Sequence, residues 1–512
     1  MKRSLAGALA GLLAAATALG VAELVAGISG PLGSPVVAVG GAVIDLTPVP
    51  VKDFAIARFG GNDKIALETG ILALLAIFAA VIGALAIRWL AAGLAGLAAF
   101  GALGVSAALT RPMAGPADAA PTVAGVLVAA LVLTLLVRAA RAAAAAQGEH
   151  RRLTASEGLG RRRFLAASAV AAVAAAVSGG AGEMLLRRFS AAGARARIRL
   201  PAAAVRAPAV PTGASLDVPG LSSFVTSNAS FYRVDTDLEV PQVLPEQWTL
   251  RITGMVDRDI ELTLGDLLRL PLIEHDMTLV CVSNEVGGSY AGNARWLGAS
   301  LPALLRRAGN RRGADQVLST SVDGMTISTP VGTIMDGRQA LIAVGMNGQP
   351  LPVEHGFPAR MLVPGLYGYV SATKWVTRLE VTTFARQRAY WTQRGYAAQA
   401  PIRTESRIDV PRPLAQLKAG RVIVAGVAWA PHRGISAVEV NVDGGPWRSA
   451  TLAAADGIDT WRQWTWPWDA APGLHTLQVR AADGTGAVQT PRRAAVFPSG
   501  ATGWDSVVVT VT

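Results

Sequence analysis

The chain has 512 residues, of which 51% are hydrophobic and 16% charged, a balance too apolar for an ordinary soluble protein. Part of it is therefore expected to lie in a membrane. The formal net charge is +12, but the basic residues gather beside apolar stretches rather than on one face, which argues against nucleic acid as a partner. The single cysteine, Cys281, excludes an intramolecular disulfide.

The first part of the chain, residues 1–182, is predicted to be a membrane domain. Five apolar stretches there are each near the length that crosses a hydrocarbon core, at about 5–28, 70–87, 90–109, 121–137 and 164–180. A shorter apolar stretch, 36–44, is cut off by Asp45 and two prolines and is predicted to be interfacial or re-entrant. None of the five predicted helices contains a histidine, which argues against a haem held by paired histidines.

The orientation of these spans is predicted from the basic residues at their ends. These residues are Lys2, Arg3, Arg88 and a cluster between the fourth and fifth spans. Placing them in the cytoplasm puts the C-terminal part on the extracytoplasmic side of the plasma membrane. Arg161-Arg162-Arg163-Phe164-Leu165 also resembles a twin-arginine export signal, which would carry an already folded domain across. Plain anchoring by positive charge is the alternative.

The remaining chain is predicted to hold two further domains after an Ala-, Pro- and Arg-rich linker, residues 183–220. Residues 221–400 read as an α+β domain, with a strand at 248–254 and short helices at 263–271 and 301–308. Residues 401–512 read as a β-sandwich, because short alternating runs recur between turn residues. The predicted strands are 422–429, 437–442, 460–468, 475–482 and 487–496.

Cys281 is the first candidate for chemistry. It lies in Thr278-Leu-Val-Cys-Val-Ser-Asn284-Glu-Val-Gly-Gly288, with Arg-Trp-Leu-Gly at 295–298. A lone cysteine is most often a buried apolar residue, but a thiolate is also a soft metal ligand. Four more motifs accompany it, namely Phe-Tyr-Arg at 231–233, Met-Asn-Gly-Gln-Pro-Leu-Pro-Val-Glu-His-Gly-Phe-Pro-Ala-Arg at 346–360, Gly-Tyr-Val-Ser-Ala-Thr-Lys-Trp at 368–375 and Trp-Thr-Gln-Arg-Gly-Tyr at 391–396.

In this order the motifs resemble the molybdopterin-binding domain of the sulfite oxidase family, from about Phe231 to the C-terminus. The last domain resembles the immunoglobulin-like dimerisation domain of that family, which implies a homodimer. The resemblance further implies a molybdenum cofactor with one molybdopterin, to which Cys281 is the protein's metal ligand.

The same resemblance implies roles for the other motif residues. His355 and Arg360 would hold the pterin phosphate, a task suited to a cation and a hydrogen-bond donor. Arg233 would line an anion pocket, and the Tyr396 phenol would assist proton transfer at the metal. The remaining cofactor-binding candidates are Asn284, Asp323, Ser371 and Lys374.

Two departures from the family pattern concern the substrate. Glu285 and Val286 stand where basic residues are expected, and Val234-Asp235 stands where a histidine is expected. Because fewer cations attract an oxyanion less well, the cofactor is better supported than sulfite as the substrate.

The expected function is oxygen-atom transfer on a small, sulfur-containing substrate by a membrane-anchored, extracytoplasmic enzyme. Neither a Cys-x-x-Cys-His nor a flavin-type glycine motif occurs, so electrons would pass to a separate electron-transfer protein or a quinone-linked carrier. Two alternatives stay open: a reductase of the methionine sulfoxide type within the same family, and an inactive scaffold or receptor that keeps the fold.

Overall fold

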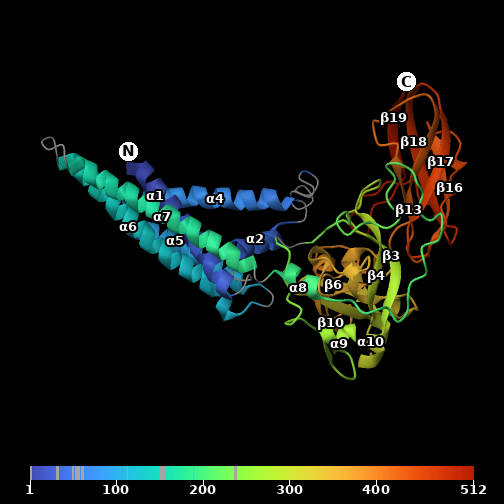
Figure 1. Ribbon diagram of the computed structural model, residues 1–512, viewed down its shortest axis with the longest axis horizontal. Coiled ribbons are helices and arrows are strands. Elements are labelled where there is room, and N and C mark those ends of the chain that lie inside the picture. Colours follow the sequence, from blue (N-terminus) through green and yellow to red (C-terminus); the bar gives the residue numbers. More distant parts are fainter. Residues whose placement is uncertain are drawn as a thin grey trace. The chain divides into compact units, whose positions relative to one another are not determined.

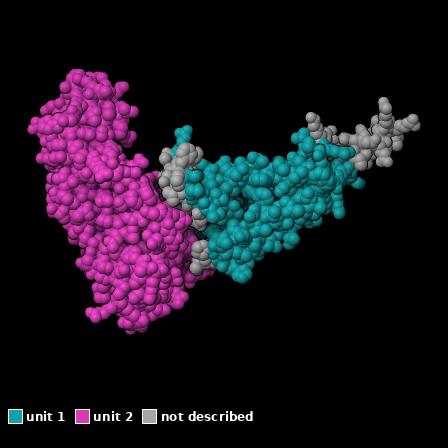
Figure 2. Space-filling model, turned by 180° about the vertical axis from the view of Figure 1, so that it is seen from behind, with its two compact units in different colours: residues 1–190, 236–242 teal, residues 191–235, 243–512 magenta. Residues whose placement is uncertain are grey.

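The computed structural model describes residues 3–29, 34–48, 51, 58, 63–111, 114–149, 156–187, 190–235 and 239–512. The chain forms two compact units, residues 1–190 with 236–242 and residues 191–235 with 243–512 (Figure 2). The described part of the first unit is helical, whereas the strands belong to the second (Figure 1).

The first unit is a bundle of long apolar helices. Five described helices are long and apolar enough to span a membrane, which agrees with the five predicted spans. The sixth helix, α2, covers the short stretch predicted at 36–44. The helices are α1 (Arg3–Ser29), α2 (Pro35–Leu46), α4 (Asp63–Ala86), α5 (Leu90–Leu109), α6 (Ala120–Glu149) and α7 (Ser156–Leu186).

Helix α1 packs against α4, α6 and α7, and small residues let the backbones approach closely (Figure 1). A Cβ added at Gly11 would overlap the carbonyl of Ala79, and one added at Gly83 would overlap the carbonyl of Gly7. Arg141 of α6 donates hydrogen bonds of 2.9 Å to the carbonyls of Ala86 and Ile87, at the end of α4. In the described part of the bundle, close backbone contact and a capped helix end thus add to a core of apolar side chains that includes Leu133 and Phe164.

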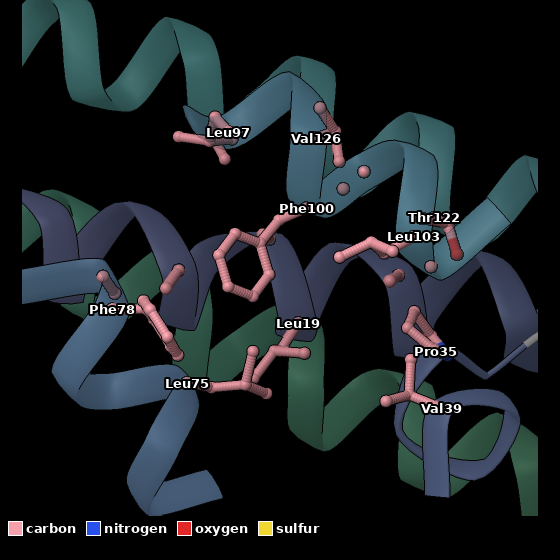
Figure 3. A pocket seen from close by; sticks show the side chains of 18 of the residues that line it. Leu19, Pro35, Val39, Leu75, Phe78, Leu97, Phe100, Leu103, Thr122 and Val126 are labelled. Atoms are coloured by element: carbon pink, nitrogen blue, oxygen red, sulfur yellow. The ribbon is translucent and has the colours of Figure 1, made fainter. Parts of the chain in front are cut away.

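An apolar pocket lies inside this unit among α1, α2, α4, α5 and α6 (Figure 3). Leu19, Leu75, Phe78 and Phe100 point into it, and the two phenylalanine rings lie 5.4 Å apart. Thr122 contributes the polar side chain of the lining. Such a surface suits hydrocarbon rather than a charged ligand.

The second unit begins with an α+β domain built on two sheets. The first sheet has the order β2-β1-β10-β5-β6, and the second has the order β3-β4-β7-β8 with β9 paired to β7. The predicted strand at 248–254 is β1, and the predicted short helices are α9 (Leu264–Leu268) and α10 (Leu301–Ala308). The strands are β1 (Thr249–Gly254), β2 (Ile260–Thr263), β3 (Leu272–Val280), β4 (Ala291–Ser300), β5 (Gln316–Ser321), β6 (Thr326–Pro330), β7 (Leu341–Met346), β8 (Gln349–Pro350), β9 (Arg360–Leu362) and β10 (Val376–Thr382).

The C-terminal domain is a β-sandwich of two sheets, β11-β13-β17-β16 and β12-β19-β18-β14-β15, around a core that includes Trp464 and Trp468. Its strands are β11 (Glu405–Val410), β12 (Gln416–Leu417), β13 (Gly420–Trp429), β14 (Ile435–Val442), β15 (Arg448–Ser449), β16 (Thr451–Leu452), β17 (Arg462–Ala470), β18 (Gly473–Asp483) and β19 (Asp505–Val511).

The last predicted strand is wrong. Residues 487–496 form a loop with two isolated bridges, and the final strand is β19. Pro491 removes a backbone donor in the middle of the predicted run, whereas the alternating apolar residues of β19 are buried on one side.

The segment predicted as a linker, 183–220, contains the end of α7 and a short helix, α8 (Ala191–Arg197). Ala191 and Ala194 are buried. Arg195 donates through Nε to the carbonyl of Leu351 at 2.8 Å and through Nη2 to that of Pro350 at 2.7 Å. From α8 to about Val205 this segment contacts the α+β domain, and farther on Gly213 and Leu216 hydrogen-bond with Ala454 and Gln463 of the sandwich.

Polar contacts join the α+β domain to the sandwich within the second unit. Asp459 of the sandwich lies 2.9 Å from His275 Nε2 on β3 and 3.1 Å from His432 Nδ1. Burial alone would raise the pKa of Asp459, but these hydrogen bonds hold it at about 2. The Trp461 backbone donates to Thr278 Oγ1 at 2.7 Å. The sandwich therefore packs against β3, the strand that immediately precedes Cys281.

Candidate functional site

Cys281 directly follows β3 and opens the loop that leads to β4. Its backbone N–H donates to Tyr290 at 2.9 Å, and its carbonyl accepts from Asn284 at 3.0 Å. Burial raises the pKa of the thiol, while hydrogen bonds from Ser283 and the charge of Lys374 act against this rise. A metal cation would take the place of the thiol proton.

Asn284 holds this loop from inside. Its side chain is buried, and its Oδ1 accepts from the Tyr290 backbone at 2.8 Å. Its Nδ2 lies 3.4 Å from Oε2 of Glu405, the first residue of β11 in the sandwich. Arg407, on the same strand, donates to the Gly288 carbonyl at 2.6 Å. The cysteine loop is thus anchored by the neighbouring domain.

Glu405 is a residue that sequence analysis missed. It is 3% exposed, and its Oε1 has no hydrogen-bond partner among the described residues. Burial raises its pKa to about 8, so the carboxyl is largely protonated at neutral pH. The sequence carried no clear signal, because strand alternation places Glu405 on the same side as Arg407 and Asp409, and β11 is buried at its first four positions.

A tight turn brings His355, Arg360 and Lys374 together. His355 ends a 3-10 turn (Val353–His355) and is followed by Gly356, whose φ is +111°. A Cβ at Gly356 would lie 3.0 Å from the Lys374 Cα, so a side chain would separate the two segments. Arg360 then opens β9.

Arg360 is buried without full hydrogen bonding. It is 7% exposed, its Nη1 lies 3.4 Å from the His355 carbonyl, and its Nε finds no acceptor in the part of the chain described. Burial lowers the pKa of the guanidinium to about 10. An unmatched buried N–H on a cation is costly, and an anionic group beside it would remove that cost.

His355 is neutral in this environment. Burial, followed by the charge of Arg360, lowers its pKa to about 4. Its Nε2 lies 3.1 Å from the Asn228 carbonyl, so the neutral ring donates its proton there. The edge of the ring also meets Phe231, 5.5 Å away between centroids. A phosphate near the other nitrogen would favour the protonated ring.

Arg233 and Lys374 meet at one carboxylate, that of Asp235. Arg233 Nε lies 2.7 Å and Lys374 Nζ 2.8 Å from the same oxygen, Oδ2. The Asp235 side chain is 3% exposed. Burial lowers the pKa of Lys374 to about 8, and Asp235 opposes that decrease.

Tyr232 is a second residue that sequence analysis did not assign to the site. Burial and the charge of Cys281 raise the pKa of its phenol, while Arg360 acts in the opposite direction. The phenol therefore lies within electrostatic reach of both the thiol and the buried guanidinium. The sequence signal for Tyr232 was its place in the Phe-Tyr-Arg motif, of which sequence analysis assigns only the arginine to the site.

Three predicted site residues, Tyr396, Ser371 and Asp323, have neighbours other than the charged side chains described above. Tyr396 lies in an aromatic cluster with the rings of Tyr369, Trp391 and Phe497, at 5.1–5.5 Å. The Ser371 hydroxyl is 2.9 Å from the Leu366 carbonyl and closes its own loop. Asp323 accepts from Met325 at 3.0 Å in the turn between β5 and β6, and this turn contacts the Trp375 carbonyl through Val322.

The charged cluster fits a cofactor that has an anionic group and a soft metal. Arg360 offers an unused donor, Lys374 and His355 adjoin it, and Cys281 supplies one soft ligand. Within the described residues, no group of three or more His, Cys, Asp or Glu side chains is placed to hold a metal ion.

Comparisons with known proteins agree with this arrangement. Residues 237–391 match the family described as oxidoreductase molybdopterin binding domain, a range that includes Cys281, His355, Arg360 and Lys374. Mitochondrial sulfite oxidase of Rattus norvegicus is 30% identical over 291 residues, 48% of this chain and 52% of that protein. Sulfite oxidase of Gallus gallus is 30% identical over 289 residues, 48% of this chain and 62% of that protein.

A solved structure shares the fold. The sulfane dehydrogenase SoxCD from Paracoccus pantotrophus superposes with a TM-score of 0.50 at 23% identity, over 57% of this chain and 84% of that one. The chain spans about half the length of the mammalian sulfite oxidases that it matches. Residues 237–391 thus form a molybdopterin-binding oxidoreductase domain of the sulfite oxidase family, whose cofactor is molybdenum bound to molybdopterin.

Proposed function

We propose that the protein is a membrane-anchored oxidoreductase that transfers an oxygen atom to or from a small sulfur-containing substrate. The observation that carries this proposal is a buried guanidinium, that of Arg360, whose Nε has no acceptor in the described structure, together with the Cys281 thiol, since the Tyr232 phenol lies within electrostatic reach of both. Burial of an unmatched cation in the same site as a thiol is expected where a bound anionic cofactor completes the site.

In this proposal each residue has a separate task. The Cys281 thiolate binds molybdenum, and Arg360 with His355 holds the phosphate of the pterin. Lys374 binds the pterin, and Asp323 and Ser371 support the backbone segments next to it. Asn284 keeps the cysteine loop in place. Tyr396 assists proton transfer, and Arg233 binds the substrate.

The cofactor would supply a metal whose oxidation state changes by two and which exchanges an oxygen atom with the substrate. For oxidation, an S–O bond forms with oxygen from water, and two protons and two electrons leave. For reduction, an S–O bond breaks, and two protons and two electrons are consumed as water forms. The electrons would pass to or from a separate electron-transfer protein or a quinone-linked carrier.

The location is also part of the proposal. Helices α1, α4, α5, α6 and α7 would anchor the chain in the plasma membrane, with the cofactor domain outside the cytoplasm. Protease treatment of intact spheroplasts tests this: the second unit should be cleaved without lysis. Changing Arg162 and Arg163 to lysine tests the export signal, since exchange of both arginines should leave the second unit inside.

Metal analysis and electron paramagnetic resonance of the purified full chain test the activity. We expect stoichiometric molybdenum and pterin, and a molybdenum signal that changes when sulfite or a methyl sulfoxide is added. Absence of both metal and pterin, with Cys281→Ser unchanged in every property, would establish the inactive scaffold instead. A molybdenum enzyme inactive with sulfite but active with a sulfoxide would establish the reductase, the candidate that the carboxylate of Asp235 favours.

A further inference from the structure

A carboxylate, that of Asp235, lies between two cations of the site, and the charge of one of them, Lys374, acts on the Cys281 thiol. Asp235 Oδ2 accepts from Arg233 Nε at 2.7 Å and from Lys374 Nζ at 2.8 Å, and Asp235 Oδ1 lies 3.4 Å from Arg233 Nη2. An oxyanion bound by the same two cations would use these donors in the same way. Asp235 therefore occupies the donors that an anionic substrate at Arg233 would need, next to the pterin-binding Lys374.

Burial strengthens the interaction of the Asp235 carboxylate with these cations. The side chain of Asp235 is 3% exposed and that of Lys374 is 11% exposed, so solvent screens their interaction only weakly. An incoming anion would have to displace the carboxylate or lie beside it, and either event is unfavourable. Burial is the largest influence on Lys374, and the charge of Asp235 is the largest that keeps it protonated, so the pair is mutually dependent.

Among the described residues, Arg360 lies within electrostatic reach of Lys374, but the loop after Cys281 adds no cation. The cysteine loop presents the exposed Glu285 and the partly buried Val286 after Asn284. Arg233 keeps 38% of its side chain exposed, so its guanidinium can still donate a hydrogen bond to an uncharged S=O group. A neutral oxygen acceptor can use this donor without removing Asp235.

We infer that Asp235 is a specificity-determining residue, a resident counter-ion of Arg233 and Lys374 that directs the site toward uncharged sulfur compounds, such as sulfoxides, and away from oxyanions. This inference rests on the proposed function, because it names the substrate class of that same site.

Sulfate binding to the cofactor-loaded full chain in detergent tests this inference by equilibrium dialysis. Asp235→Asn should bind sulfate at least about tenfold more tightly than the unchanged protein, a difference of about 1.4 kcal/mol. In steady-state assays, the ratio of kcat/KM for sulfite to kcat/KM for a methyl sulfoxide should rise in the same variant. Asp276→Asn is the matched control, because Asp276 is also buried and paired with an arginine, 2.6 Å from Arg295 Nη2. It should change neither quantity.

Two further measurements keep the inference open to contradiction. Asp235→Ser removes the charge with a smaller side chain, and its metal content and melting temperature show whether it is folded. A folded Asp235 variant that binds sulfate no better than the unchanged protein would overturn the inference. If neither variant folds, Arg233→Gln decides: tight sulfate binding by the unchanged protein that is lost in Arg233→Gln would also overturn it, whereas weak binding in both would support it. Molybdenum content of the unchanged protein reports separately on the proposed function.

Discussion

The two units of this chain bury opposite kinds of surface. In the first, helices meet where side chains are absent, as at Gly11 and Gly83, and the described pocket is apolar. In the second, Arg360, Lys374 and Glu405 are buried with their ionisable groups, and two of them have unmatched polar atoms. Helix packing in the first unit involves few polar groups. In the second unit, buried charge lowers the stability of the fold, and a bound ligand can offset this cost.

The largest expected effect concerns the thiol. Cys281→Ser should lower turnover by at least about 10³-fold, the scale expected when a group at the reacting centre is removed. A hydroxyl is a harder and far less acidic ligand than a thiol. Turnover and the molybdenum resonance signal would be measured together. Ser289→Ala, at an exposed position of the same loop, should retain both, and normal turnover by Cys281→Ser would contradict the ligand assignment.

A helix contact in the first unit provides the next test. Gly83→Leu should destabilise the bundle by about 3 kcal/mol or more, because the side chain would overlap the backbone of α1. Thermal unfolding of the purified full chain, followed by circular dichroism, measures this. Gly70→Leu on the same helix is the matched control, since nothing lies within 4 Å of its added Cβ. Equal melting curves for both variants would mean that the helices do not meet at Gly83.

Removal of a buried charge should, in contrast, stabilise the protein. Arg360→Met should stabilise the cofactor-free protein by about 1–3 kcal/mol, because it removes a desolvated cation with an unmatched donor. The same change should reduce pterin content after purification. Arg378→Met, at a side chain 48% exposed, should change neither the melting temperature nor the pterin content. A less stable cofactor-free Arg360→Met protein would show that the guanidinium is satisfied without a ligand.

The last expected effect is a pH dependence of stability from Glu405. The folded protein keeps a proton up to a pKa of about 8, whereas the unfolded chain releases it near the usual value of 4.5. The folded state therefore binds more protons between these values, so stability falls as pH rises across this window, by on the order of a few kcal/mol. Glu405→Gln should flatten the decrease measured by denaturant unfolding at pH 5 and pH 8. The exposed Glu261→Gln should leave it unchanged.

Local features of the chain were predictable because they depend on neighbouring residues. The apolar stretches identify the five candidate spans, and the pattern of residues 301–308 identifies α10 to the residue. The order of the motifs around Cys281 pointed to the cofactor domain. The prediction failed at 487–496, where alternation alone did not account for Pro491 and the competing run in β19.

Composition and periodicity by themselves determined that this chain has apolar helices and a sandwich, because hydrophobic periodicity and turn residues act over a few positions. The cofactor domain was predicted from the resemblance of its ordered motifs to a known family. Only the tertiary structure decided which charges meet. Asp235 reaches Lys374 across 139 residues, and Glu405 reaches Asn284 across 121. Pairing and desolvation at such separations depend on the folded backbone, and they determine which groups around Cys281 remain charged.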